Sequence, residues 1–154
     1  MPTHRSFGQF ANRMNFIAKE FADRTTRTVR SVALAVHQTA VLATPVDTGR
    51  SRSAWFASFG APILRSNENP PVDQSANRGA RQSQATRVAL EQGLPVLASW
   101  RIGSGEIFIS NGVPYIGELD RGSSRQAPHG MSKIAVQAGR RVLAQSRLLP
   151  PGTS

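Results

Sequence analysis

The sequence predicts an α+β protein in which a long N-terminal helix and a C-terminal helix pack on a small, mostly antiparallel sheet. Apolar residues recur at helical spacing near both ends of the chain, and two short runs of strand-forming residues lie between them. The chain has 154 residues, the usual size of one domain. We therefore expect a single domain over residues 1–154, with a loose tail at 149–154.

The first element is expected to be one long helix over residues 6–43. Ser6 and Gln9 fit a capping box at its start, and Pro45 ends it, because the residue before a proline resists the helical region. At ~1.5 Å per residue such a helix is roughly 57 Å long, more than a compact domain of this size needs. Part of it is therefore expected to pack on a neighbouring subunit. The apolar stripe of its first half consists of Phe7, Phe10, Met14, Ile17 and Phe21.

Three arginines, Arg24, Arg27 and Arg30, follow one another at intervals of three beside this stripe. They form a basic patch, which is either a solvated face or a contact with DNA or an acidic partner.

The middle of the chain predicts a strand followed by a loop. Residues 44–50 contain turn-forming residues, and residues 50–59 then alternate with a period of two, which predicts a strand with Trp55 and Phe59 toward the core. Residues 61–83 are rich in proline, asparagine, serine and arginine, so we expect a long exposed loop.

The second half predicts three helical segments and one strand. Gln84–Gln92 is expected to be helical and to be interrupted by Gly93-Leu94-Pro95. Glu106–Asn111 is rich in β-branched and aromatic residues and predicts a strand. Pro114–Leu119 suits a short helical turn, and Ser132–Leu148 has the spacing of a final helix.

The charge balance is strongly basic, with 19 Lys and Arg against 9 Asp and Glu and a net charge of +10. Such a chain favours nucleic acid, a membrane surface or acidic protein surfaces as partners. The chain has no cysteine, which excludes disulfides and thiolate metal sites. No apolar run is long enough to span a bilayer and the start lacks a signal-like apolar segment, so we expect a protein that is made in the cytoplasm and contacts no membrane.

The potentially reactive residues do not form a catalytic pattern. His4, His37 and His129 have no second ligand at metal-binding spacing. Glu118 and Asp120 are two residues apart, and such positions point away from each other on a helix. We expect no enzymatic activity, no metal and no cofactor.

Two stretches carry a resemblance to a known family. TPVDTGRSRSAW (Thr44–Trp55) and IFISNGVPYIGELDRGSSRQAPHGM (Ile107–Met131) together resemble the minor tail-component family, the small neck or tail-completion proteins of long-tailed bacteriophages. Members share a long helix, a Pro-Val-Asp-Thr-Gly turn, two strands around a variable middle, a Pro-Tyr corner and a last helix. The chain departs from the family where Leu119-Asp120-Arg121-Gly122 replaces the usual Leu-Glu-x-Gly.

The resemblance implies a non-enzymatic structural protein of the virion. It would form a sixfold or twelvefold ring at the head–tail junction, connect or complete the tail, and let DNA pass. Its implied partners are copies of itself, the head-closure or connector, tail-terminator or major tail proteins, and DNA without sequence specificity.

Two groups of residues are expected at these contacts. Arg24, Arg27 and Arg30 are candidates for facing the DNA channel or an acidic partner. The candidates for subunit or partner contacts are Arg50, Arg52, Tyr115, Glu118, Arg121, Gln126 and Met131. Two alternatives stay open: a basic protein that binds nucleic acid without sequence specificity, and a tail-assembly factor that leaves before the virion is complete.

Overall fold

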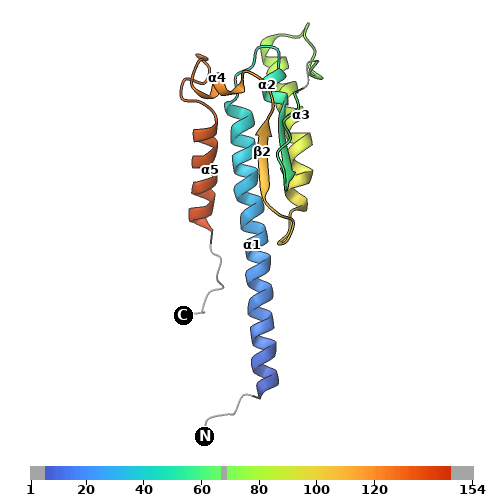
Figure 1. The fold of residues 1–154 in the computed structure, drawn as a ribbon, viewed down its shortest axis with the longest axis vertical. Coiled ribbons are helices and arrows are strands. Elements are labelled where there is room, and N and C mark those ends of the chain that lie inside the picture. Colours follow the sequence, from blue (N-terminus) through green and yellow to red (C-terminus); the bar gives the residue numbers. More distant parts are fainter. Residues whose placement is uncertain (1–5, 67–68, 147–154) are drawn as a thin grey trace.

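The structure, a computed structural model, describes residues 6–66 and 69–146 of the chain. It confirms the α+β class, with a long N-terminal helix, a C-terminal helix and a small antiparallel sheet. In Figure 1, α1 forms the spine of the molecule, with α3 on one side and α5 on the other. In chain order the elements are α1 (Phe7–Ala43), α2 (Arg50–Ser53), β1 (Trp55–Phe59), α3 (Arg78–Ser99), β2 (Ile107–Asn111), α4 (Ile116–Asp120) and α5 (Ser132–Gln145).

Helix α1 begins and ends where the local signals predict. The Oγ of Ser6 accepts a hydrogen bond from the Gln9 backbone N–H at 3.3 Å, and the Gln9 side chain accepts one from the Ser6 N–H at 3.3 Å. This capping box satisfies donors that the first helical turn leaves unpaired. The helix ends at Ala43, two residues before Pro45. Its N-terminal half extends beyond the other helices and both strands (Figure 1).

The sheet is a single antiparallel pair in which Ala57 lies opposite Ile109. Within the described residues the sheet contains these two strands alone. The predicted strand over residues 50–59 is wrong in its first half, since residues 50–53 form the helical turn α2. Gly49 begins this turn with a positive φ of 84°, and its carbonyl accepts a hydrogen bond from the Ser53 N–H at 3.0 Å.

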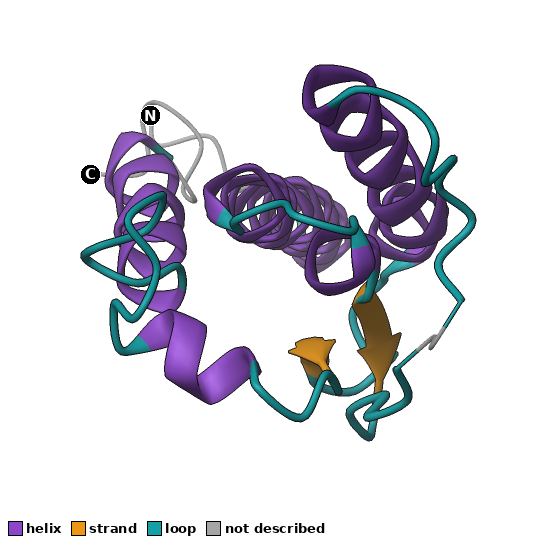
Figure 2. Cartoon of the chain, turned by 90° about the horizontal axis from the view of Figure 1, so that it is seen from above, coloured by secondary structure: helices purple, strands orange, loops and turns teal. Residues whose placement is uncertain are grey.

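Both faces of the two-stranded sheet are covered. Trp55 and Ala57 face the helices, where Trp55 packs with Ala40 and Val41 of α1. Phe56, on the face predicted to point outward, is also buried, because it packs with Ile63 of the following loop. Seen along the axis of α1 (Figure 2), the strands lie on one side of that helix.

Helix α3 is longer than the sequence predicts. It begins at Arg78, where the Asn77 side chain accepts a hydrogen bond from the Ala80 N–H at 2.9 Å, and it continues through Pro95 to Ser99. The interruption expected at residues 93–95 is therefore wrong, and the exposed loop ends at residue 77. Packing outweighs the lost hydrogen bond of the proline, because the backbone at Gly93 lies against the ring of His37 in α1.

The C-terminal helix lies along α1, and a residue of α4 caps its first turn. The Asp120 Oδ1 accepts hydrogen bonds from the N–H groups of Met131 and Ser132, at 2.7 and 2.8 Å, and so caps the start of α5. Gly139 allows the close approach, because a Cβ there would lie 2.6 Å from a methyl group of Val36 in α1. The helix ends at Gln145, because Ser146 is already extended, so the expected end at Leu148 is three residues too late. The loose tail expected at 149–154 lies outside the described residues.

None of the helices in the described part of the chain is long and apolar enough to cross a bilayer.

Candidate interaction surfaces

The most prominent apolar surface lies on the part of α1 that extends beyond the body. We call it the arm stripe: Phe7, Phe10, Met14, Ile17 and Phe21. Phe7 is 85% exposed, Phe10 58%, Met14 49% and Phe21 43%. These positions fall on one face of the helix. Exposed apolar patches of this kind mark interaction sites in soluble proteins.

A second apolar surface lies between α1, β2 and α5. This α1–α5 groove has a volume of about 530 Å³, and its polar lining is limited to the Thr28 side chain and backbone atoms. Ile107 and Ile109 of β2 form one wall. Among the described residues β2 pairs with β1 alone, so the groove runs beside the strand whose other edge is unpaired. The residues that line it are Thr28, Val29, Val32, Ala33, Val36, Ile107, Ile109 and Leu143.

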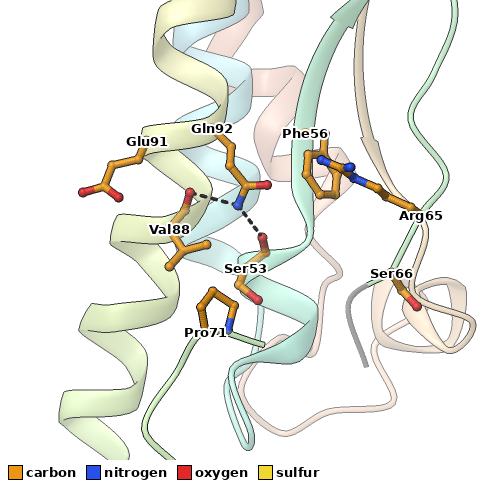
Figure 3. A pocket seen from close by; sticks show the side chains of 8 residues that line it. All are labelled: Ser53, Phe56, Arg65, Ser66, Pro71, Val88, Glu91 and Gln92. Carbon is orange, nitrogen blue, oxygen red and sulfur yellow. Dashed lines mark hydrogen bonds between the residues drawn. The ribbon is translucent and has the colours of Figure 1, made fainter. Parts of the chain in front are cut away.

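A pocket of about 730 Å³ lies on the other side of the sheet, between β1, α3 and the loop (Figure 3). The Arg65 guanidinium stacks 4.8 Å from the centre of the Phe56 ring. The Gln92 side chain donates to the carbonyls of Ser53, at 3.3 Å, and Val88, at 3.0 Å. The carboxylate of Glu91 points away from these groups in Figure 3. The polar side chains therefore hold backbone and ring in place and do not converge on a common point.

Arg52, expected at a subunit contact, is buried inside the subunit and is 4% exposed. Its guanidinium donates to the carbonyl of Thr44, at 2.7 and 2.9 Å, and to that of Leu42, at 3.0 Å. A further hydrogen bond of 3.1 Å joins it to the hydroxyl of Thr86 in α3. Burial lowers the pKa of Arg52. Arg52 thus satisfies the last carbonyls of α1 and ties this helix to α3.

Met131 is also buried, with none of its surface exposed. Like Arg52, it is therefore not part of the surface that this subunit presents.

Arg50, the first residue of α2, lies beside Tyr115, which directly precedes α4. The Arg50 guanidinium lies 6.0 Å from the centre of the Tyr115 ring and donates to the Ser66 hydroxyl at 3.1 Å. Tyr115 is 40% exposed, so this pair remains accessible to a partner.

The corner around α4 uses its charged side chains within the subunit. Glu118 and Arg121 form an exposed ion pair with an O···N distance of 3.1 Å. The exposed Gln126 accepts a hydrogen bond from the Val46 N–H at 3.3 Å. Burial alone would raise the pKa of Asp120, but the hydrogen bonds from the N–H groups of Ser132 and Met131 lower it. These contacts fasten the corner to the end of α1 and to the start of α5.

The three arginines of the expected basic patch have different environments. Arg24 pairs with Glu20 at 3.6 Å. Arg30 is half-buried and donates to the Trp100 carbonyl at 2.7 Å, at the end of α3. Arg27 is exposed. They do not act as one uniform surface, since Arg30 holds α3 against α1.

His37 is fully buried, and no pattern in the sequence indicates its role. Within the described residues neither ring nitrogen makes a hydrogen bond of good geometry, and burial lowers the pKa of the imidazole even though the Trp55 backbone nearby raises it. His37 is therefore a packing residue that fits against Gly93.

No group of three or more His, Cys, Asp or Glu that could hold a metal ion occurs within residues 6–66 and 69–146. The chain matches no family model, no curated protein and no solved structure.

Proposed function

We propose that this chain is a non-enzymatic structural protein of the neck of a long-tailed phage. Its copies form a ring at the head–tail junction that connects or completes the tail and lets DNA pass. The observation that carries the proposal is the arm stripe: large aromatic side chains exposed on a capped helix, uncovered by the described remainder of the subunit. Such a surface is expected in a protein whose work is to assemble with others.

The arrangement of the two family-like stretches supports the proposal. Thr44–Trp55 and Ile107–Met131 are distant in sequence but contact each other at one end of the molecule. The Asn111 side chain donates to the Ser51 carbonyl at 2.7 Å, and Gln126 accepts from the Val46 N–H. The motifs that carry the resemblance thus build one continuous structural unit.

A direct test uses a phage that encodes this chain and carries a nonsense mutation in its gene. We expect filled heads and tails that fail to join or complete, and we expect purified wild-type protein to restore infectivity when it is added to that lysate. Quantitative mass spectrometry of purified wild-type virions should find several copies of the chain in each particle. Absence from virions, or a single copy per particle, would sink the neck assignment. Absence combined with restored infectivity would favour an assembly factor that leaves.

The net charge of +10 favours one rival, a protein that binds nucleic acid freely and without sequence specificity. Binding of that kind weakens steeply with ionic strength, because each neutralised phosphate releases counterions. We expect binding of the purified chain to duplex DNA to disappear at moderate salt, while its incorporation in virions survives. Loss of the chain from purified virions at the same salt that abolishes its DNA binding would favour the rival over the neck assignment.

A further inference from the structure

We infer that the arm stripe of one subunit binds the α1–α5 groove of a second copy of the chain. Each subunit would then bind one neighbour through its arm stripe and another neighbour through its groove. The inference rests on the proposed function only for its setting, a ring in the neck. The contact itself is a property of the purified protein and is tested there.

The groove has the shape and chemistry to take aromatic side chains. Its floor is formed by the valines of α1, one wall by the isoleucines of β2, and the other wall by Leu143 of α5. Figure 2 shows the C-terminal helix and the strands on adjoining sides of α1. Since its lining is almost entirely apolar, water in the groove has few partners and is readily displaced by hydrocarbon.

The arm is ready to bind without further folding. Its capping box and its continuity with the packed part of α1 hold the stripe on one face, so little conformational entropy is lost on docking. From the area of such side chains and their exposed fractions, the four most exposed members of the stripe offer roughly 450 Å². A matching area on the groove, together with flanking side chains, brings the total near the ~1,000 Å² that a specific interface needs.

The occupant is a second copy because the arm cannot reach its own groove. The stripe and the groove floor belong to one uninterrupted helix of 37 residues, so the arm cannot fold back without breaking α1. Both unlike surfaces exist on every subunit, and contact between them is therefore head-to-tail. Such a contact forms a closed ring when the rotation between subunits fits, and an open filament otherwise.

The first experiment measures the mass of the full-length protein in solution by light scattering across a range of concentrations. We expect the wild type to form species larger than a dimer. Phe10→Gln and Phe21→Gln in the stripe, and Leu143→Gln in the groove, should each weaken this assembly about tenfold or more. Circular dichroism should show that the variants stay folded, because all three side chains are at least 43% exposed.

Two controls match these changes in chemistry and differ in place. Phe16 is 64% exposed on the opposite face of the same arm. Ile134 is 40% exposed on α5 but does not line the groove. Phe16→Gln and Ile134→Gln should leave the assembly unchanged. A monomeric wild type, or controls that disrupt assembly as much as the stripe variants do, would overturn the inference.

The second experiment identifies which surfaces meet, and the chain suits it because it has no cysteine. A Phe10→Cys protein mixed with a Leu143→Cys protein should give a heterodimer with a short bis-maleimide cross-linker, and Phe16→Cys mixed with Leu143→Cys should not. A protein with cysteines at both 10 and 143 should give a ladder of multimers. If Phe10→Cys couples only to itself, two stripes pair across a twofold axis and the groove is not the partner.

The two proposals fail separately. A chain that assembles through stripe and groove but is absent from virions keeps the contact and loses the neck role. If the chain is present in virions in many copies but its assembly does not depend on the stripe, the neck role is kept and the stripe–groove contact is refuted.

Discussion

The two halves of α1 have apolar residues at the same helical spacing but differ in how much the rest of the subunit buries them. In the C-terminal half, Ala33, Ala40 and Val41 are buried, and α3, α5 and the sheet cover the helix. In the N-terminal half, the phenylalanines are exposed, Phe7 most of all. The periodicity is shared, so it does not determine which half is covered.

Side-chain size separates the halves. Alanines, together with glycines on the partner helices, let α3 and α5 approach α1 closely: Gly93 lies against His37, and Gly139 against Val36. Phenylalanines in the arm prevent such close packing and instead offer large rings to an outside partner. Close approach between helices thus marks the covered half of α1, and exposed aromatic rings mark the arm.

The largest expected difference in the free energy of unfolding is between the substitutions of two methionines, one in each region. Met131→Ala, at a fully buried position, should lower the free energy of unfolding by roughly 3–4 kcal/mol, because it leaves a cavity in the body. Met14→Ala, on the arm, should change it by less than about 0.5 kcal/mol in the monomer. Urea denaturation at low protein concentration measures both. Equal losses would show that the arm is part of the folded core.

The next effect concerns the end of the covered half. Arg52→Leu should cost about 2–3 kcal/mol, because the carbonyls of Leu42 and Thr44 lose their charged donor while buried. Arg50→Leu, two residues away, should cost about 1 kcal/mol or less, since its contact with Tyr115 is partly exposed. Thermal melts of the two variants provide the comparison. A smaller loss for Arg52→Leu than for Arg50→Leu would contradict the capping role.

A smaller effect tests the close approach of α3 to α1. Gly93→Ala should cost about 2 kcal/mol, because the new methyl group would lie 2.3 Å from a ring carbon of His37. Gly79→Ala lies in the first turn of the same helix, where a Cβ would lie 3.4 Å from the Asn77 side-chain oxygen, an ordinary contact distance. There alanine should stabilise the helix by up to about 1 kcal/mol. Opposite signs in a denaturant titration confirm the difference, and a shared sign refutes it.

The smallest effect is a pH dependence inside the covered half. Because burial lowers the pKa of His37 in the folded protein, the unfolded chain takes up a proton at higher pH than the folded one does. The stability contributed by the neutral ring is full above about pH 6.5 and is lost as the pH falls toward the lower folded pKa. The slope should not exceed about 1.4 kcal/mol per pH unit for this one group. His37→Leu should flatten it between pH 6.5 and 5, as measured by denaturation at each pH, and an unchanged slope would assign it to another group.

The elements that local signals specify were predicted well from the sequence. Ser6, Gln9 and Pro45 are all within a few residues of the helix ends they fix, so the bounds of α1 were accessible. The second strand was accessible too, because its side chains have a strong preference for extended backbone.

The elements that depend on distant contacts were not predictable in this way. Pro95 indicates a break by itself, and only the fit of Gly93 against His37 shows why α3 continues. The alternation around Arg52 predicts a strand, whereas hydrogen bonds to the end of α1 select a helical turn. Asp120 caps a helix that begins twelve residues later, a relation that no spacing rule contains.

The capping box at Ser6 keeps the arm helical to its first residue, so the stripe faces one defined direction. Because α1 is one continuous helix, the direction of the stripe is fixed relative to the groove by the number of residues between them. One residue inserted after Arg24 would turn the stripe by about 100° and advance it by about 1.5 Å, whereas seven would restore nearly the same direction about 10.5 Å farther out. The number of residues in α1 therefore sets both the distance and the direction from the groove to the stripe, and so where one subunit can bind the next.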